Sequence, residues 1–90
     1  MSPVLMNAKL PYTDMSRGKI VNADWIEMCS ISCCLNDDCD MAVWKNGVCY
    51  NFNCQIERDC LWENDKHSNA KIVYIWNRHP KLGKYNFLFR

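Results

Sequence analysis

The clearest pattern in the chain is a pair of short apolar runs on either side of a turn signal. Residues 41–45 read Met-Ala-Val-Trp-Lys and residues 48–52 read Val-Cys-Tyr-Asn-Phe, with Asn46 and Gly47 between them. Asn and Gly are the residues that supply the two positive φ angles of a type I′ turn. The pattern therefore predicts a β-hairpin with its turn at Asn46 and Gly47.

A two-residue turn also fixes which residues of the two strands lie opposite each other. In the predicted register Trp44 faces Cys49 and Val43 faces Tyr50 across the hairpin. One face then carries Met41, Val43, Tyr50 and Phe52, and the other carries Ala42, Trp44 and Cys49. Because both faces are apolar near the turn, we expect the hairpin to lie in the centre of a sheet rather than at its edge.

A helix is predicted immediately before the hairpin, from Trp25 to about Leu35. Asp24 is a suitable N-cap, and Glu27 three residues later gives the spacing of a capping box. Trp25, Cys29 and Cys33 recur every four residues and share one face, which we expect to pack on the sheet.

The remaining segments give weaker signals. Residues 18–21 and 70–77 are rich in β-branched and aromatic residues, so we expect two further strands. Residues 1–15 are mixed and are expected to be a loosely ordered lead-in, and residues 55–69 a polar connection. One helix packed on an antiparallel sheet is an α+β domain.

Composition limits the class of protein. The chain has 90 residues, so it forms one small domain that buries only about 60–65% of its unfolded surface. Its net charge of +1 argues against nucleic-acid binding and against a polybasic membrane surface. No apolar run approaches the roughly 18 residues that a membrane span needs.

Seven cysteines dominate the candidate chemistry, with the spacing C-x3-C-C-x4-C-x9-C-x4-C-x5-C. Zinc sites favour C-x2-4-C pairs, often with histidines, but His67 and His79 lie outside the cluster. No sequence feature singles out a nucleophilic thiol with a base beside it. We therefore predict a disulfide framework, with no catalytic residue, metal or cofactor, built from Cys29, Cys33, Cys34, Cys39, Cys49, Cys54 and Cys60.

The pairing of these cysteines is only partly determined by the sequence. Because the helical face with Cys29 and Cys33 must dock on the sheet, one of the two is expected to bond Cys49 and the other Cys39. Cys34 is about 100° around the helix from Cys33, so the two cannot serve the same partner strand. Since seven is odd, at least one cysteine has no partner within this chain.

Three carboxylates follow the predicted helix, at Asp37, Asp38 and Asp40. A calcium site needs six to eight oxygen ligands from a shaped loop, so a solvated turn is the favoured interpretation.

The cysteine content also bears on the compartment. Small disulfide-rich domains belong to oxidising compartments, yet the first fifteen residues lack the features of a signal peptide. We expect the chain to be a piece of a longer secreted or cell-surface protein. The alternative is a reduced or metal-bound domain of the cytosol.

Several of these motifs together resemble the MANSC domain, the motif at the N terminus with seven cysteines. They are the Cys29-Ser-Ile-Ser-Cys33-Cys34 run, the Ala42 and Trp44 strand, the Gly47-Val-Cys49-Tyr50 stretch, and Cys54 with Cys60. The resemblance covers about residues 17–78 and is greatest for the PKD-repeat membrane proteins related to the dyslexia-associated protein and the adeno-associated-virus receptor.

The resemblance implies a fold and a function. It implies a small disulfide-rich PAN/apple-like fold and a module of residues 17–78, preceded by a lead-in (1–16) and followed by a tail or truncated linker (79–90). It also implies a non-catalytic extracellular recognition or spacer module in the ectodomain of a single-pass membrane protein for adhesion, migration or trafficking. The expected partner is an unidentified protein or glycan, with no nucleic acid and no direct membrane contact. The alternative is an accessory module of a membrane-anchored Kunitz-type serine-protease inhibitor.

Overall fold

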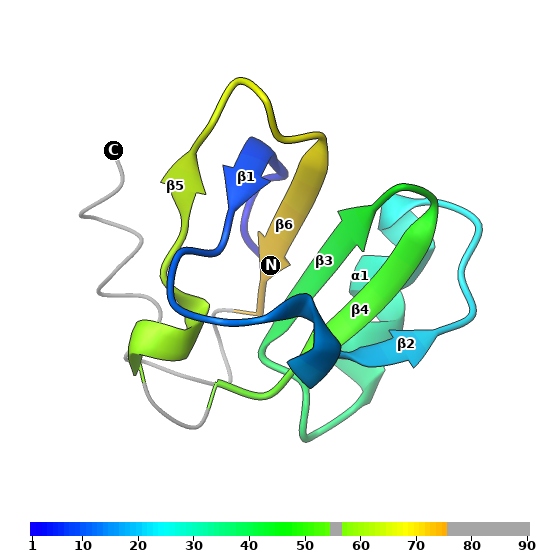
Figure 1. The fold of residues 1–90 in the computed structure, drawn as a ribbon. Helices are drawn as coiled ribbons and strands as arrows, with labels where there is room; N and C mark the ends of the chain where they lie inside the picture. Colours follow the sequence, from blue (N-terminus) through cyan, green and yellow to red (C-terminus); the bar gives the residue numbers. More distant parts are fainter. Residues whose placement is uncertain (55–56, 76–90) are drawn as a thin grey trace.

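A computed structural model describes residues 1–54 and 57–75, which form a six-stranded antiparallel sheet with one α-helix packed against it (Figure 1). The strand order is β2-β4-β3-β6-β1-β5. The strands are β1 (Leu5–Lys9), β2 (Lys19–Val21), β3 (Met41–Lys45), β4 (Val48–Phe52), β5 (Glu63–Asn64) and β6 (Ala70–Tyr74), and the helices are α1 (Ile26–Leu35) and the short 3-10 helices η1 (Met15–Arg17) and η2 (Glu57–Cys60). The α+β class predicted from the sequence is confirmed.

The hairpin of β3 and β4 has the predicted turn and register. Asn46 and Gly47 have φ angles of 53° and 77°, so both lie in the left-handed region that the turn requires. Trp44 lies opposite Cys49, and Val43 lies opposite Tyr50. The hairpin is also central, because β2 pairs with β4 and β6 pairs with β3.

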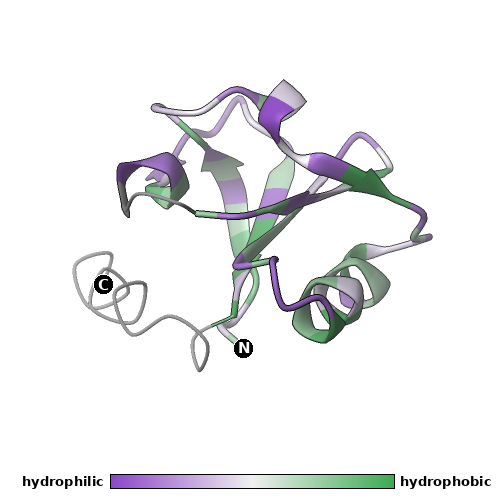
Figure 2. Cartoon of the chain, turned by 90° about the horizontal axis from the view of Figure 1, so that it is seen from below, coloured by the Kyte–Doolittle hydropathy of each residue, from purple (hydrophilic) through white to green (hydrophobic). Residues whose placement is uncertain are grey.

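The alternation along the strands gives the sheet two apolar faces. Met41 and Val43 of β3 join one buried cluster with Ile72 of β6, whereas Ala42 joins a second cluster with Val73. Helix α1 covers the second face, and the segment that leads from β1 through η1 crosses the first (Figures 1 and 2). We call the face that α1 covers the helix face, and the face with Met41 and Val43 the open face.

The start of α1 differs from the prediction. The helix begins at Ile26, and Trp25 is its N-cap residue, with no side-chain capping bond, so the capping box of Asp24 and Glu27 was wrong. Trp25 is 54% exposed, while Ile26, Cys29 and Cys33 are buried against the sheet. The orientation of the helix is thus set by the residues that it buries, because their packing outweighs the roughly 1 kcal/mol of a cap.

The outer side of α1 is apolar as well. Met28, Ile31 and Leu35 are 40%, 52% and 80% exposed, and their spacing places them along one side of the helix. Because these three residues are exposed while Ile26, Cys29 and Cys33 are buried, the stripe lies on a side of α1 that does not pack against the sheet.

The interpretation of residues 1–15 as loosely ordered was wrong. Residues Leu5–Lys9 form β1, which pairs with both β6 and β5. A bulge between Leu5 and Ala8 holds Asn7 at a φ of 51° and breaks the two-residue alternation. Backbone pairing with β5 and β6 holds this strand in the sheet, because Ala8 is its only buried residue.

The second half of the chain adds to the same sheet. The predicted polar connection over 55–69 contains η2 and the two-residue strand β5. The strand predicted over 70–77 is present as β6, which ends at Tyr74, while residues 76 and 77 lie outside the described residues. The tail predicted at 79–90 also lies outside them, so the domain boundaries stay predictions.

Candidate functional site

The first bridge joins the helix to the centre of the sheet. Cys29 of α1 bonds Cys49 of β4, with 5.5 Å between their Cα atoms. Both residues are completely buried, at 0% exposure, between the helix and the helix face. The bond therefore fixes α1 across the hairpin.

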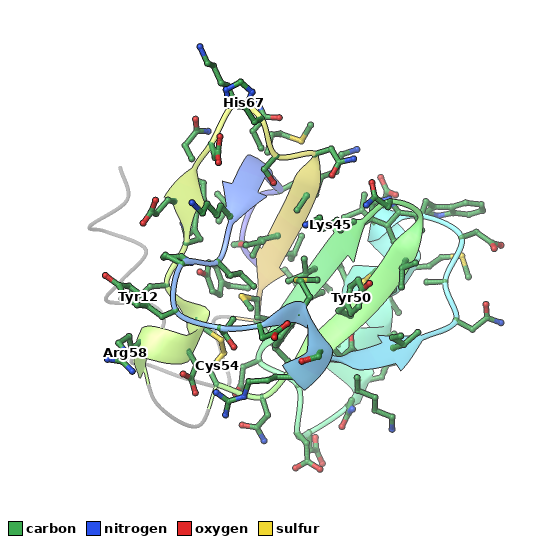
Figure 3. The ribbon with its side chains drawn as sticks, in the orientation of Figure 1. Tyr12, Lys45, Tyr50, Cys54, Arg58 and His67 are labelled. Atoms are coloured by element: carbon green, nitrogen blue, oxygen red, sulfur yellow. A yellow bond between two sulfur atoms is a disulfide. The ribbon has the colours of Figure 1, made fainter. Side chains whose placement is uncertain are left out.

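The second and third bridges close short loops. Cys33 near the end of α1 bonds Cys39, six residues later, just before β3 begins. The expected connections of Cys29 and Cys33 to Cys49 and Cys39 are thus both present. Cys54, labelled in Figure 3, bonds Cys60 at the end of η2, and both pack against the buried cluster of the open face. The sequence did not specify this pairing.

The seventh cysteine, Cys34, is half-buried and lies outside these three bridges. Its neighbour Cys33 faces the sheet and is fully buried. The angular offset between adjacent helical residues accounts for this difference.

Tyr74 ties the third bridge to the sheet. Its hydroxyl donates a hydrogen bond to the carbonyl oxygen of Cys60, and its backbone N–H donates one to the Ser2 hydroxyl at 2.8 Å. Burial raises the pKa of Tyr74 far above its ordinary value, because the phenolate would lose its hydration.

Sequence reasoning missed the structural role of Asp40. Asp37 and Asp38 are exposed, as a solvated turn predicts, but Asp40 is only 1% exposed. Its carboxylate accepts a hydrogen bond from the Cys54 backbone N–H at 2.7 Å, and its carbonyl accepts one from Ile75 at 3.0 Å. The carboxylate thereby holds the chain that follows β4 against the start of β3.

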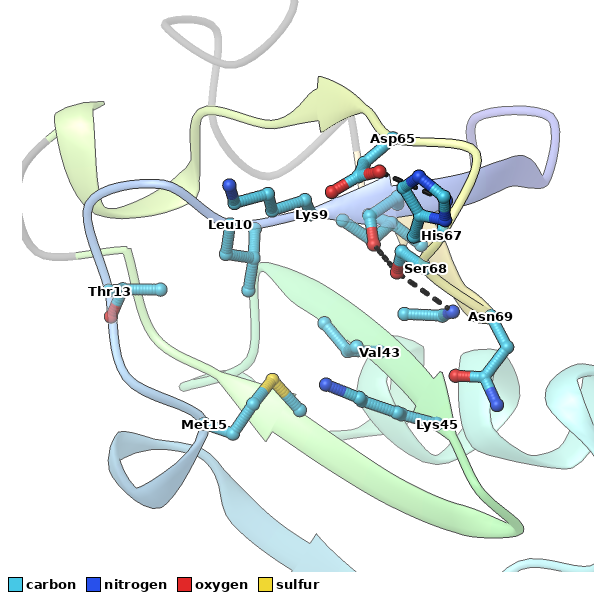
Figure 4. Close-up of a pocket in the computed structure, with 13 residues that line it drawn as sticks. Lys9, Leu10, Thr13, Met15, Val43, Lys45, Asp65, His67, Ser68 and Asn69 are labelled. Carbon is cyan, nitrogen blue, oxygen red and sulfur yellow. Dashed lines mark hydrogen bonds between the residues drawn. The ribbon is translucent and has the colours of Figure 1, made fainter.

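A cavity of about 330 Å³ opens on the open face, between the segment that follows β1 and the loop before β6 (Figure 4). Its apolar lining consists of Ala8, Leu10, Met15, Val43, Ala70 and Ile72. The charged residues of the lining are Lys9, Lys45 and Asp65. Lys9 and Lys45 lie on opposite sides of the hollow, with Leu10 and Val43 between them (Figure 4).

Sequence reasoning missed this cavity for two reasons. Lys9 lies in a segment that was expected to be loosely ordered, and the loop with His67 and Ser68 was interpreted only as a polar connection. A lysine at the end of β3 carries no signal of its own, because Lys45 and Lys9 line the same cavity only once β1 joins the sheet beyond β6.

Asp65, His67 and Ser68 on the rim have the residue types of a hydrolytic triad but not its arrangement. The Asp65 carboxylate accepts from the backbone N–H of His67, at 2.9 Å, rather than from its ring. The Ser68 hydroxyl donates to the carbonyl oxygen of Ala8 and accepts from the Ala70 N–H at 3.2 Å. These bonds shape the loop and do not form the relay that activates a serine.

Within 1–54 and 57–75 no three His, Cys, Asp or Glu side chains lie close enough to hold a metal ion together. In these same ranges no helix has both the length and the apolar character to cross a membrane.

The comparisons with known proteins gave one match. No curated protein and no solved structure is significantly similar to the chain. A family described as the dyslexia-associated protein KIAA0319 N-terminal domain matches residues 3–79, which include β1 and all seven cysteines. This supports the predicted kinship with the dyslexia-associated proteins, while the MANSC assignment stays a prediction. Because the match covers most of this chain, the chain belongs to the family of the KIAA0319 N-terminal domain.

Proposed function

We propose that this domain is a non-catalytic extracellular recognition or spacer module. It would form the N-terminal part of the ectodomain of a PKD-repeat, single-pass membrane protein that acts in cell adhesion, migration or trafficking. The match to the KIAA0319 N-terminal domain over residues 3–79 is the observation that carries this proposal.

The covalent structure supports an extracellular location. Three disulfides link a chain of 90 residues, and such density is typical of proteins that fold in oxidising compartments. Each bridge contributes on the order of 2–4 kcal/mol, which a small core does not supply by itself. The family and the bridges are therefore both compatible with the cell surface.

The geometry of the polar residues supports a role in binding rather than catalysis. Six cysteines are held in bridges, and the Ser68 hydroxyl is engaged with backbone atoms. We propose a protein or glycan as the partner, with no nucleic acid and no direct membrane contact, because the net charge of the chain is +1.

The alternative is an accessory module of a membrane-anchored Kunitz-type serine-protease inhibitor. In this alternative the complete protein would carry a Kunitz domain beside the module instead of PKD repeats. The family match favours the PKD-repeat context. Sequencing the full transcript distinguishes the two, since PKD repeats with a membrane span support the first and a Kunitz domain supports the second.

The location is tested on the endogenous protein. Intact cells are treated with an impermeant biotin reagent, and the captured protein is alkylated before and after reduction. We expect surface labelling, with six cysteines alkylated only after reduction. Recovery of an intracellular protein with all seven thiols open to alkylation would refute the proposal.

A further inference from the structure

We propose that Asn46, at the tip of the hairpin of β3 and β4, is a site of spontaneous deamidation whose rate is controlled by a hydrogen bond from Asn69. The modification goes beyond the recognition role proposed above, because it changes the covalent structure of the module itself. The reaction consumes only water, and its leaving group is ammonia.

The sequence and the turn together make the side-chain amide of Asn46 reactive. Asn46 is the one asparagine of the chain that a glycine follows. A glycine leaves its backbone nitrogen unhindered, because it has no Cβ atom. Asn46 and Gly47 are both exposed, and apart from the chain neighbours of Gly47 no residue lies within 4 Å of the position that a Cβ atom would take there. Water therefore has free access to this part of the turn.

The reaction joins a main-chain atom to the neighbouring side chain. The backbone nitrogen of Gly47 gives up its proton to hydroxide and attacks Cγ of Asn46. The new N–Cγ bond closes a succinimide ring, the Cγ–Nδ2 bond breaks, and Nδ2 takes up a proton and leaves as ammonia. Water then opens the ring. Its addition at Cγ gives aspartate, whereas its addition at the backbone carbonyl carbon gives isoaspartate, in which the main chain runs through Cβ and Cγ.

A hydrogen bond from a distant part of the chain restrains the reacting group. The side-chain amide of Asn69, the residue directly before β6, donates to Oδ1 of Asn46 at 2.7 Å and across 23 positions of the sequence. Cγ of Asn46 must turn toward the Gly47 nitrogen before the new bond forms, and this rotation separates Oδ1 from Asn69. Since the hydrogen bond is lost on the way to the succinimide, it slows the reaction in the folded chain.

The two products differ in their effect on the hairpin. Asp-Gly suits a type I′ turn as Asn-Gly does, so aspartate keeps the turn. Isoaspartate adds a carbon to the main chain of a two-residue turn, which disturbs the pairing of Lys45 with Val48 beside it. Because β3 and β4 each have a second neighbour in the sheet, the disturbance extends to β6 and β2.

The test uses the 90-residue chain with its three bridges formed, incubated at neutral and at mildly alkaline pH. Samples are then reduced, alkylated and digested with trypsin. Mass spectrometry with electron-transfer fragmentation measures asparagine, aspartate and isoaspartate at each asparagine position. We expect modification at position 46 ahead of all the other asparagines, with isoaspartate among the products. The rate should be higher at alkaline pH, because the attacking nitrogen must first lose its proton.

Matched variants isolate the role of Asn69. Asn69→Ala removes the donor and should speed the reaction of the folded chain by about two- to tenfold. Asn64→Ala is the control, because Asn64 is also exposed but donates to the carbonyl oxygen of Met6, and it should leave the rate unchanged. After reduction and in urea, the wild type and both variants should react at one common rate, because the hydrogen bond exists only in the folded chain.

The stability of the products tests the effect on the hairpin. The variant Asn46→Asp should keep the urea midpoint of the wild type. The isoaspartate form, isolated by chromatography after incubation, should unfold at a lower urea concentration. An isoaspartate form as stable as the wild type would overturn the expected disturbance of the hairpin.

Two results would overturn the assignment of the site. The first is a modification at position 46 no greater than at the other asparagines. The second is a rate in folded Asn69→Ala that equals or falls below the rate of the wild type. Neither result affects the proposed location at the cell surface, which the biotin labelling tests separately.

Discussion

Gly47 illustrates how a single backbone angle controls the central hairpin. Its φ of 77° lies in the left-handed region, and a Cβ atom built there meets no atom within 4 Å. A substitution at this residue therefore strains the backbone without any collision of the side chain. β-Branched residues are the least tolerant of positive φ.

We expect Gly47→Val to lower the free energy of unfolding by about 1–2 kcal/mol. Gly47→Asn is the matched control, because Asn adopts positive φ more readily and should cost less. Urea unfolding followed by circular dichroism measures both variants. Equal stability of the wild type and Gly47→Val would contradict the role of the turn.

Gly18 is required for a different reason, which is close packing. A Cβ atom at this position would lie 2.6 Å from Cζ of the Phe52 ring, although its φ of −82° suits any residue. Phe52 is only 4% exposed, so its ring has little room to move.

Gly18→Ala should therefore destabilise the domain by about 1–3 kcal/mol, the usual cost of overpacking. The same substitution in a Phe52→Leu background should cost less, because the smaller side chain removes the collision. Thermal unfolding of the wild type, the two single variants and the double variant measures the coupling free energy between Gly18 and Phe52. A cost that is the same in both backgrounds would place the strain elsewhere.

At the scale of elements, the bridges determine how α1 is held on the sheet. The Cys29–Cys49 bond spans 20 residues and joins the helix to β4, whereas Cys33–Cys39 spans six and closes a local loop. A longer loop loses more entropy in the unfolded chain when it is closed.

Replacing both Cys29 and Cys49 by Ala should cost about 3 kcal/mol, against about 2 kcal/mol for Cys33 and Cys39. Both values follow from loop length, and the burial of all four cysteines adds a cavity cost to each. Urea unfolding of the two double variants tests the order. A greater loss from the shorter bridge would show that native contacts, rather than loop closure, set the stability.

At the scale of the whole molecule, Tyr74 connects the N-terminus, β6 and the Cys54–Cys60 loop. Its backbone bonds to Ser2, and its hydroxyl bonds to the carbonyl of Cys60. Burial raises its pKa, so the folded state keeps the phenol neutral at pH values where the unfolded chain ionises.

The raised pKa of Tyr74 predicts that the domain becomes less stable at alkaline pH. Below about pH 10, the ordinary tyrosine pKa, both states are protonated and the stability is fully present. As the pH rises further, only the unfolded state loses the proton, so the free energy of unfolding falls. Urea midpoints between pH 8 and 11 should fall less steeply in Tyr74→Phe than in the wild type.

Tyr12→Phe is the control for this measurement, because Tyr12 is 53% exposed and lies 5.5 Å from Arg58 at the surface. It should keep the wild-type pH dependence. An equally steep decline in Tyr74→Phe would assign the alkaline loss to other groups.

The short-range features were predictable because their physical cause lies within a few residues. The Asn46-Gly47 turn fixed the register of β3 and β4, and that register gave the two faces of the sheet. The face of α1 with Cys29 and Cys33 followed from the helical repeat, and with it the two bridges from α1 to Cys49 and Cys39. The start of the helix was misjudged because a cap contributes less than the burial of Ile26.

The long-range features were not predictable from the same signals. Strand β1 pairs with β6, more than sixty residues away, and only Ala8 of this strand is buried. In the sequence, Asp40 belongs to an apparent acidic surface turn. In the structure it is buried, and its carboxylate accepts a hydrogen bond from the Cys54 N–H in the chain after β4. The cavity combines Lys9, Lys45 and His67 from three separate parts of the sequence.

The sequence by itself determined the hairpin, the helix, the α+β class and the disulfide chemistry, because each depends on residue types at short, fixed spacings. Only the tertiary structure decided where the first strand lies, how Asp40 is buried, and which charged side chains surround the cavity. Those features depend on backbone pairing between distant segments, and such pairing leaves no periodic trace in a polar or mixed stretch of sequence.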